Sequence, residues 1–476
     1  MKTLWQKQAD ENADEKSGRE TGAGADRSWF YRFTAEEDRE LDRKLIPYDI
    51  LVNLAQARML RKIGVYDDTG FESVTAALTA TWQQWQRGNF DLGPDDEDVH
   101  SAVERLLTEK AGADGARIHT GRSRNDQVLA DMRLFMKEAI LENATEWIAI
   151  ADRLRGLSEQ YRDVFFAGLT HTQPAMPHSA DAWAAGYADL LCSDLQALRQ
   201  AYEIIDRSPL GSAAGYGVPH IPVDREQVSA ELGFAQVQVP VAASQLSRGR
   251  FEMQLADALT YGALTFNRMA SDVVLFMHPS LGLVTLSEDQ VSGSSIMPQK
   301  RNPDAWELIR GAYHNLQSAR IHLASVPANL TSGYHRDLQQ VKKSIMAALE
   351  QSKLLAGAVR HALAGLAFDA EAAARTLTPE VYATHEANRL VAEGVPFREA
   401  YRKVATATAR TTAPEAGREP SQQPGQIRSG YHHSGAPGSG MPDELQKAFR
   451  ELSEWTVQQK KHMESIKMTL LGIRHE

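Results

Sequence analysis

Five long segments of this chain carry apolar residues at spacings of three and four, and this pattern restricts the fold more than any other feature. The segments span residues 128–160, 179–207, 244–277, 303–325 and 338–366. Apolar residues at these spacings form a stripe along a helix, and such stripes must be buried against one another. The pattern predicts an all-α fold around a central bundle of long helices. Rods of about 45 Å rarely bury their apolar surface within one subunit, so we expect oligomerisation to extend the bundle.

Shorter elements flank the predicted bundle on both sides. Short helices are expected between residues 35 and 110, and a last helix between 442 and 470. Residues 1–30 are polar and are expected to be partly mobile, and the Pro-, Gly- and Ser-rich stretch 411–440 is expected to be flexible. The sequence thus predicts an N-terminal helical domain, the central bundle and a C-terminal helical domain, with bounds 1–124, 125–368 and 369–476.

Charge and cysteine content exclude several classes of protein. The net charge of −10 argues against general attraction to nucleic acid or to an anionic membrane, so an anionic substrate needs a local cationic site. The single cysteine, Cys192, permits neither an intrachain disulfide nor a cysteine-based zinc site. No stretch approaches the roughly 18 apolar residues that span a bilayer, and the polar N-terminus lacks a secretory pattern. We therefore expect a cytoplasmic protein.

The loop GSSIMPQKRNPD at 293–304 is the first candidate site. It places two hydroxyls and the cations Lys300 and Arg301 beside a helix start, where Asn302 can act as N-cap. Free N–H groups at a helix start favour anions, so the loop predicts an anion site. The same residues also fit an ordinary capped turn between helices.

A histidine between the first two rods is the next candidate. His171 lies in GLTHTQPAMP, where Pro174 and Pro177 keep it out of a helix interior. Flanked by Thr170 and Gln173, the imidazole can transfer a proton. A histidine in a turn is nevertheless more often structural.

A third candidate is the turn HTGRSRNDQ at 119–127. Its two arginines, with Ser123 and Asn125, can hold a carboxylate through bidentate contacts. The alternative is a basic surface turn that caps the helix beginning near Val128.

Taken together and in this order, the three segments resemble the fumarase/aspartase superfamily, with GSSIMPQKRNPD as its signature loop. HTGRSRNDQ, DEDVH at 96–100 and SGYHRDLQ at 332–339 resemble its argininosuccinate lyase branch, and the similarity runs from about residue 30 to 405. The resemblance implies a three-domain, all-helical subunit in a homotetramer. It also implies active sites where segments of three subunits meet, a small-molecule substrate, and no metal or other cofactor.

The resemblance also implies roles for individual residues. Ser294 takes the position of the base that removes the substrate's Cβ proton, and His171, oriented by Glu307, that of its proton partner. The division of acid and base between the two stays open. Lys300 and Asn302 are suited to stabilise the dianionic intermediate. The positions of substrate contacts fall on Arg124, Asn125, Thr170, Lys300, Asn302, Tyr334, Gln339 and Lys342.

Two departures keep the substrate open. The segment THTQPAMP is closer to adenylosuccinate lyase than to argininosuccinate lyases, and Asp38 aligns with a substrate-contact serine of the family. The leading hypothesis is cleavage of argininosuccinate to arginine and fumarate by β-elimination, as in arginine biosynthesis. The alternatives are a lyase for adenylosuccinate or another N-succinyl compound, and a non-catalytic, crystallin-like structural protein.

Overall fold

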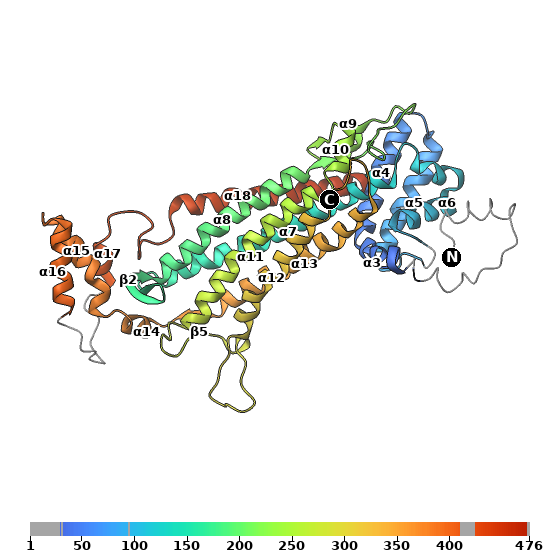
Figure 1. Ribbon diagram of the computed structural model, residues 1–476. Helices are drawn as coiled ribbons and strands as arrows, with labels where there is room; N and C mark the ends of the chain where they lie inside the picture. The colour runs from blue at the N-terminus through green and yellow to red at the C-terminus, as the bar shows by residue number, and fades with distance from the viewer. Residues whose placement is uncertain (1–28, 30–31, 94–95, 410–423, 474–476) are drawn as a thin grey trace.

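The computed structural model describes Trp29 and residues 32–93, 96–409 and 424–473. Of the segments predicted to be mobile, 1–28 and 30 fall outside the described residues, as does 411–423 of the stretch 411–440. Figure 1 shows an elongated molecule, with N-terminal helices at one end of a long bundle and short C-terminal helices at the other.

Long helices form the centre of the molecule, as the apolar stripes predict. They pack side by side around aromatic side chains such as Trp147 and Phe266, whose rings meet edge to face at 5.9 Å. Their bounds are α7 (Arg124–Gln160), α8 (Ala180–Ile205), α11 (Arg250–Phe276), α12 (Asp304–Ser325) and α13 (Gln339–Ala364). The prediction of an all-α fold around a central bundle of long helices is confirmed.

One predicted rod is divided. Residues 244–277 do not form a single helix, because α10 (Val241–Leu246) ends before α11 begins at Arg250. Gly249 lies between them with φ +79°, a left-handed conformation that stops an α-helix. A Cβ at this position would also meet the Pro327 ring at about 3.0 Å.

The N-terminal helices cover one end of the bundle and frame the cavity described below. They are α3 (Glu37–Asp42), α4 (Ile46–Lys62), α5 (Asp68–Gln86) and α6 (Val99–Ala116). The short helical turns along the chain are η1 (Arg32–Glu36), η2 (Arg43–Leu45), η3 (Arg117–His119), η4 (Glu288–Gln290), η5 (Arg336–Leu338) and η6 (Pro379–Tyr382).

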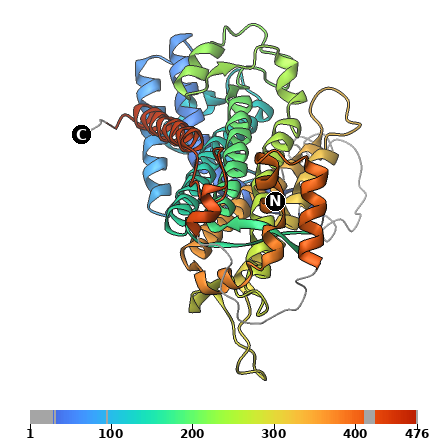
Figure 2. The same cartoon turned by 90° about the vertical axis from the view of Figure 1, so that its left-hand side faces the viewer.

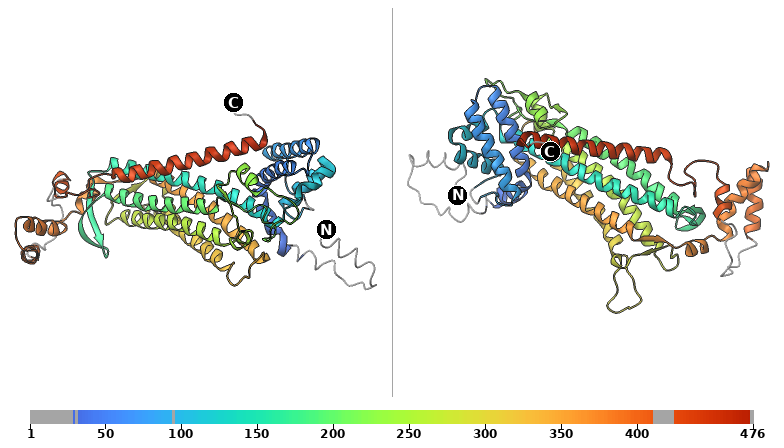
Figure 3. Two further views of the ribbon diagram at one scale, coloured as in Figure 1. Left: turned by 90° about the horizontal axis from the view of Figure 1, so that it is seen from above. Right: turned by 180° about the vertical axis from the view of Figure 1, so that it is seen from behind.

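The last helix, α18 (Asp443–Leu471), returns along the outside of the bundle against α7 and α8 and reaches α4 (Figure 3). Arg58 on α4 donates to the carbonyl oxygens of Thr469 and Leu470 at 2.7 and 3.2 Å. These contacts satisfy carbonyls that a helix end leaves without intrahelical partners.

Short strands and helices complete the described chain. β1 (Phe165–Thr170) and β2 (Gln173–Ser179) form an antiparallel hairpin at the end opposite α3. Two smaller pairs join β3 (Arg207–Ser208) to β4 (Gln236–Val237) and β5 (Val284–Leu286) to β6 (Leu366–Phe368). The remaining helices are α9 (Arg225–Glu231), α14 (Ala370–Arg375), α15 (Ala383–Ala392), α16 (Phe397–Ala409) and α17 (Pro424–Ser429). Within the described ranges, no helix is long and apolar enough to cross a membrane.

Candidate active site

A cavity of about 620 Å³ opens where the N-terminal helices meet α7 and α13. Residues from η5 and from the start of α11 complete its wall. Five of the predicted substrate contacts line it together: Arg124, Asn125, Tyr334, Gln339 and Lys342. The chain therefore brings residues more than 200 positions apart into one polar pocket.

The turn HTGRSRNDQ supplies both a helix cap and one wall of this cavity. Ser123 Oγ accepts a hydrogen bond from Asn125 N at 3.3 Å, and Asp126 Oδ1 accepts one from Ser123 N at 2.9 Å. This capping box is the structural role weighed for the turn. Arg124 faces the cavity and is paired with Asp98 at 3.1 Å and Glu97 at 3.4 Å. Arg122 also lines the cavity, and its guanidinium donates to Asn53 Oδ1 at 2.7 Å.

Lys342 is the cation of the opposite wall. Its ammonium lies between two carboxylates of α3, 2.9 Å from Asp38 Oδ1 and 2.5 Å from Asp42 Oδ1. Burial by itself would lower the pKa of Lys342, but Asp42 and Asp38 outweigh it and raise the pKa above its ordinary value. The side chain thus stays charged at neutral pH.

Two arginines of this cavity are not among the residues predicted from the sequence. Arg248 lies over the Tyr334 ring at 4.9 Å, and its buried Nη1 has no hydrogen-bond partner among the described residues. Arg336 donates through Nε to Gln339 Oε1 at 3.0 Å. No sequence signal separates Arg248 from Arg250 two residues later, but a buried cation with a free donor suits a carboxylate ligand.

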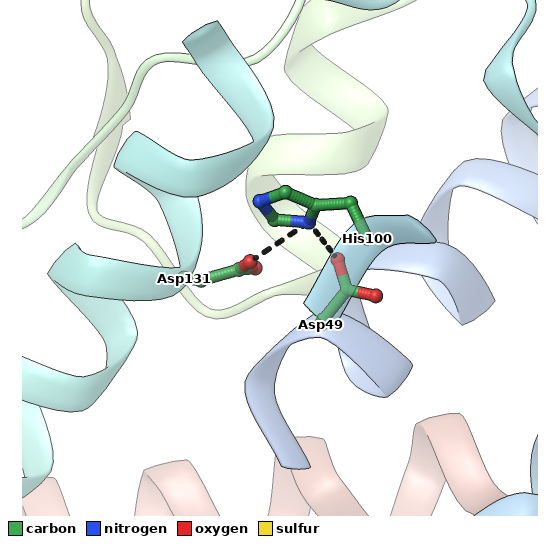
Figure 4. A group of neighbouring side chains, drawn as sticks. All are labelled: Asp49, His100 and Asp131. Atoms are coloured by element: carbon green, nitrogen blue, oxygen red, sulfur yellow. Dashed lines mark hydrogen bonds and ion pairs between the residues drawn. The ribbon is translucent and has the colours of Figure 1, made fainter. Parts of the chain in front are cut away.

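A buried charged cluster adjoins the cavity, and its His100 forms part of the cavity wall. His100 Nδ1 is 2.7 Å from Asp49 Oδ1 and 3.6 Å from Asp131 Oδ2, and Figure 4 shows the three side chains directed toward one another. Gln127 also donates to Asp49 Oδ1 at 2.6 Å. Burial disfavours the imidazolium, but Asp49, Asp98 and Asp131 raise the pKa of His100 to about 9.

The donor types of this cluster are those of a divalent metal site. The geometry, however, favours a proton on Nδ1, because the short contact with Asp49 is a hydrogen bond between an imidazolium and a carboxylate. A metal ion would have to displace that proton, and Arg122 nearby adds a further positive charge. We therefore interpret the cluster as an ion pair that fixes α4, α6 and α7 beside the pocket.

The signature loop projects from the side of the bundle between η4 and α12 (Figures 1 and 2). Backbone hydrogen bonds between Ser292 and Asn302 close its base, at 3.1 and 2.9 Å. Ser294 Oγ accepts hydrogen bonds from Ile296 N at 3.4 Å and Met297 N at 3.2 Å. Lys300 is exposed, and within the described residues its side chain has no ion-pair partner.

The N-cap of α12 lies one residue after the expected position. Pro303 occupies the N-cap position, α12 begins at Asp304, and no side chain caps it. Asn302 instead donates to Ser292 Oγ at 3.4 Å, so the predicted N-cap role of Asn302 is wrong. The Asn302 side chain therefore belongs to the base of the signature loop.

The predicted histidine lies at the tip of the hairpin. Thr170 pairs with Gln173, so His171 and Thr172 form a two-residue turn, with φ values of +53° and +62°. Two positive φ values define the turn that matches the twist of the flanking strands, but they are unfavourable for a β-branched residue such as Thr172. The turn leaves the His171 ring exposed.

The C-terminal segment after α17 holds the base of this hairpin. Gly438 N donates to Ser179 Oγ at 3.1 Å and to Asp181 Oδ1 at 3.0 Å. Gly440 N donates to the second Asp181 oxygen at 2.8 Å, and Arg162 donates to Gly438 O at 2.9 Å. Residues 424–440 of the stretch expected to be flexible therefore consist of α17 and turns that are hydrogen-bonded to the bundle.

One chain does not bring all the predicted site residues together. Ser294, Lys300 and Asn302 are on the projecting loop, Glu307 is in the first turn of α12, and Thr170 and His171 are on the hairpin. The other five line the cavity at the far end of the bundle, and Figures 1 and 2 show the three groups in different places. No hydrogen bond or ion pair joins Glu307 to His171 in the described part of the chain, so that pairing stays a prediction.

Comparison with known proteins gives the family. A sequence profile of the lyase family matches residues 27–317. The argininosuccinate lyase of Thermotoga neapolitana is 40% identical over 374 residues, which are 79% of this chain and 94% of that relative. The argininosuccinate lyase of Sorangium cellulosum is 42% identical over 393 residues, 83% of this chain and 91% of that relative.

A solved structure shows the same fold at lower sequence identity. EDDS lyase in complex with formate superimposes with a TM-score of 0.75 and 20% identity, covering 92% of this chain and 94% of that chain. The sequence identities and the family match agree with the motifs at 119–127 and 293–304. The chain belongs to the argininosuccinate lyase family of the fumarase/aspartase superfamily.

Proposed function

We propose that this chain is a C–N lyase that cleaves argininosuccinate to arginine and fumarate. The observation that carries the proposal is the 40% identity with an argininosuccinate lyase over nearly the whole of that relative. The cavity supports it, because its wall contains both cations and carboxylates. Such a lining suits a substrate that carries both carboxylates and cationic groups.

The chemistry is a β-elimination. A base removes a proton from the succinyl Cβ, the C–H electron pair forms the double bond of fumarate, and the C–N electron pair leaves with the guanidine nitrogen, which becomes protonated. A carbon acid beside a carboxylate is weak, so the dianionic intermediate needs donors where the charge develops. We assign the base to Ser294, with His171 as its proton partner, and assign charge stabilisation to Lys300 and Asn302.

Ser294 is suited to this role by its loop. Two backbone N–H groups already point at its hydroxyl oxygen, and hydrogen bonds to the charged form of a group favour that form. The neighbouring Lys300 cation would act in the same direction. A loop that closes over the substrate would also exclude water.

We further propose a homotetramer whose active sites combine segments of different subunits. The exposed apolar side chains on the long helices support this assembly, because large apolar side chains in one region of a surface indicate an interface. They include Tyr261, Leu264, Leu308, Ile321 and Leu354 on α11, α12 and α13. In such an assembly the loop and the hairpin of neighbouring subunits would reach the cavity of a third.

The direct test follows fumarate by its ultraviolet absorbance when purified protein is mixed with argininosuccinate and, separately, with adenylosuccinate. We expect turnover with argininosuccinate alone. Turnover with adenylosuccinate alone would indicate an adenylosuccinate lyase. No release from either compound would favour another N-succinyl substrate or a structural, crystallin-like role.

The three domains 1–124, 125–368 and 369–476 are part of the same proposal, as are a role in arginine biosynthesis and a cytoplasmic location. The lone cysteine, Cys192, is buried and unpaired, which fits a reducing compartment.

A further inference from the structure

Asp38 joins two predicted substrate contacts that come from the other end of the sequence. Its Oδ1 is 2.9 Å from Lys342 Nζ, and its Oδ2 accepts a hydrogen bond from Gln339 Nε2 at 3.2 Å. Arg336 donates to the amide oxygen of the same Gln339 at 3.0 Å. The Gln339 amide is therefore held at both ends, with its N–H group toward Asp38 and its oxygen toward Arg336.

Asp38 and Asp42 share the Lys342 ammonium unequally. All three side chains line the cavity, but Asp42 is 1% exposed and Lys342 is 8% exposed, whereas Asp38 is 21% exposed. Asp42 also accepts a hydrogen bond from Val99 N at 3.1 Å, so it ties α3 to α6. Asp42 is thus the buried, structural partner of Lys342, and Asp38 is its more exposed partner.

Other charged groups surround this pair. Arg336 approaches from η5, His100 from α6 and Arg248 from the break between α10 and α11. The charge of His100 acts to lower the pKa of Asp42, and the charge of Asp38 acts to raise the pKa of Arg248. Among these groups, Asp38 alone contacts both Lys342 and Gln339.

We propose that Asp38 is a positioning residue, which fixes the Lys342 ammonium and the Gln339 amide at the cavity wall in the arrangement that binds the amine half of the substrate. This inference rests on the proposed function. Without the Asp38 carboxylate, Lys342 would turn fully toward Asp42 and the Gln339 amide would be held at one end only, by Arg336. Both groups would then have to be ordered when substrate binds, which weakens binding more than it slows the chemical step.

The test is an Asp38→Asn variant, assayed for turnover of argininosuccinate. We expect KM to rise about tenfold, as for the loss of a charge-assisted contact, with kcat within about threefold of the wild type. The alkaline limb of the kcat/KM profile should move to lower pH, because Lys342 loses one of the carboxylates that raise its pKa. Asp38→Glu keeps the negative charge, so its KM should stay close to the wild-type value.

The neighbouring pair provides a matched control. Glu37 and Lys343 form an ion pair one position along the same two helices, but both side chains are more than half exposed. Glu37→Gln should leave KM and the pH profile unchanged. The proposal is overturned if a folded Asp38→Asn variant keeps KM within twofold and its alkaline limb does not move.

A second measurement separates this inference from the proposed function. Acetic anhydride modifies only the neutral amine, so the pH dependence of Lys342 acetylation, read by mass spectrometry, reports the state of its ammonium. Asp38→Asn should make Lys342 reactive at lower pH than in the wild type, whereas Glu37→Gln should not. If wild-type protein does not cleave argininosuccinate, the proposed function fails. Unchanged acetylation in Asp38→Asn would defeat the positioning role.

Discussion

The Ser294 hydroxyl differs from that of its neighbour Ser295 by its backbone contacts. Ile296 N and Met297 N both donate to Ser294 Oγ, and Ser294 is half-buried while Ser295 is exposed. We expect Ser294→Ala to lower kcat by about 10³-fold or more, because general acid–base groups contribute factors of about 10²–10⁴. The circular dichroism spectrum should not change, since the loop base is closed by backbone bonds.

Ser295→Ala is the matched control for this prediction and should keep most of the activity. Comparable losses in the two variants would indicate that the loop needs its polarity rather than one specific hydroxyl. Full activity in a folded Ser294→Ala variant would remove Ser294 from the mechanism.

His100 makes stability depend on pH. Its pKa is raised to about 9 in the folded chain from an ordinary value of 6.5, so its ion pair contributes fully below about pH 6.5 and is lost as the pH rises through 9. We expect Tm to fall by several degrees between pH 6.5 and 9.5, as measured by thermal unfolding. The fall should be smaller in His100→Gln, which has no proton to lose.

His119 is the control for this pH dependence. Burial and then Arg122 lower its pKa to about 4, so its neutral form is favoured and it contributes no change above pH 6.5. The Tm of His119→Gln should therefore fall between pH 6.5 and 9.5 as much as the Tm of the wild type does. If Tm falls equally with pH in the wild type, His100→Gln and His119→Gln, groups other than His100 cause the loss of stability.

At the scale of elements, the apolar periodicity predicted the helices whose positions are set by core packing. It did not predict the features that are set by backbone conformation. Segments 303–325 and 338–366 correspond to α12 and α13 within two residues, because their apolar stripes face the core. The break at Gly249 was missed, since a glycine in a helical pattern does not reveal a positive φ. The hairpin was missed as well, although Pro174 and Pro177 did exclude a helix around His171.

Gly262 on α11 makes room for the ring of Trp147 on α7. A Cβ built there would lie 2.4 Å from that ring, which is fully buried. We expect Gly262→Ala to destabilise the fold by about 1–3 kcal/mol, the usual range for overpacking, measured by denaturant unfolding. Gly156 on α7 is the control, because it is exposed with nothing within 4 Å of such a Cβ. Gly156→Ala should be neutral or stabilise by about 0.5–1 kcal/mol.

At the scale of the molecule, the sequence located the parts of the candidate site but not their distances. Five predicted substrate contacts line one cavity, because α3, α7 and α13 meet at the same end of the bundle. The loop with Ser294 and the hairpin with His171 lie elsewhere on the same chain. Motif order along a sequence carries no information on which copy of the chain supplies each part, so their meeting in one site stays part of the proposed assembly.

Shared sites make a specific prediction for mixed oligomers. Ser294→Ala and His171→Asn should each be inactive as pure proteins, because every site then lacks one of the two groups. After mild dissociation and reassociation of the mixture, some sites receive Ser294 and His171 from unmutated segments of different subunits, and we expect up to about a quarter of the wild-type activity.

Subunit exchange is verified by native mass spectrometry of differently tagged chains. Each variant taken alone through the same cycle is the control and should stay inactive. Persistent inactivity in mixtures with demonstrated exchange would mean that both groups of a site come from one subunit, against the separation of loop and hairpin in this chain.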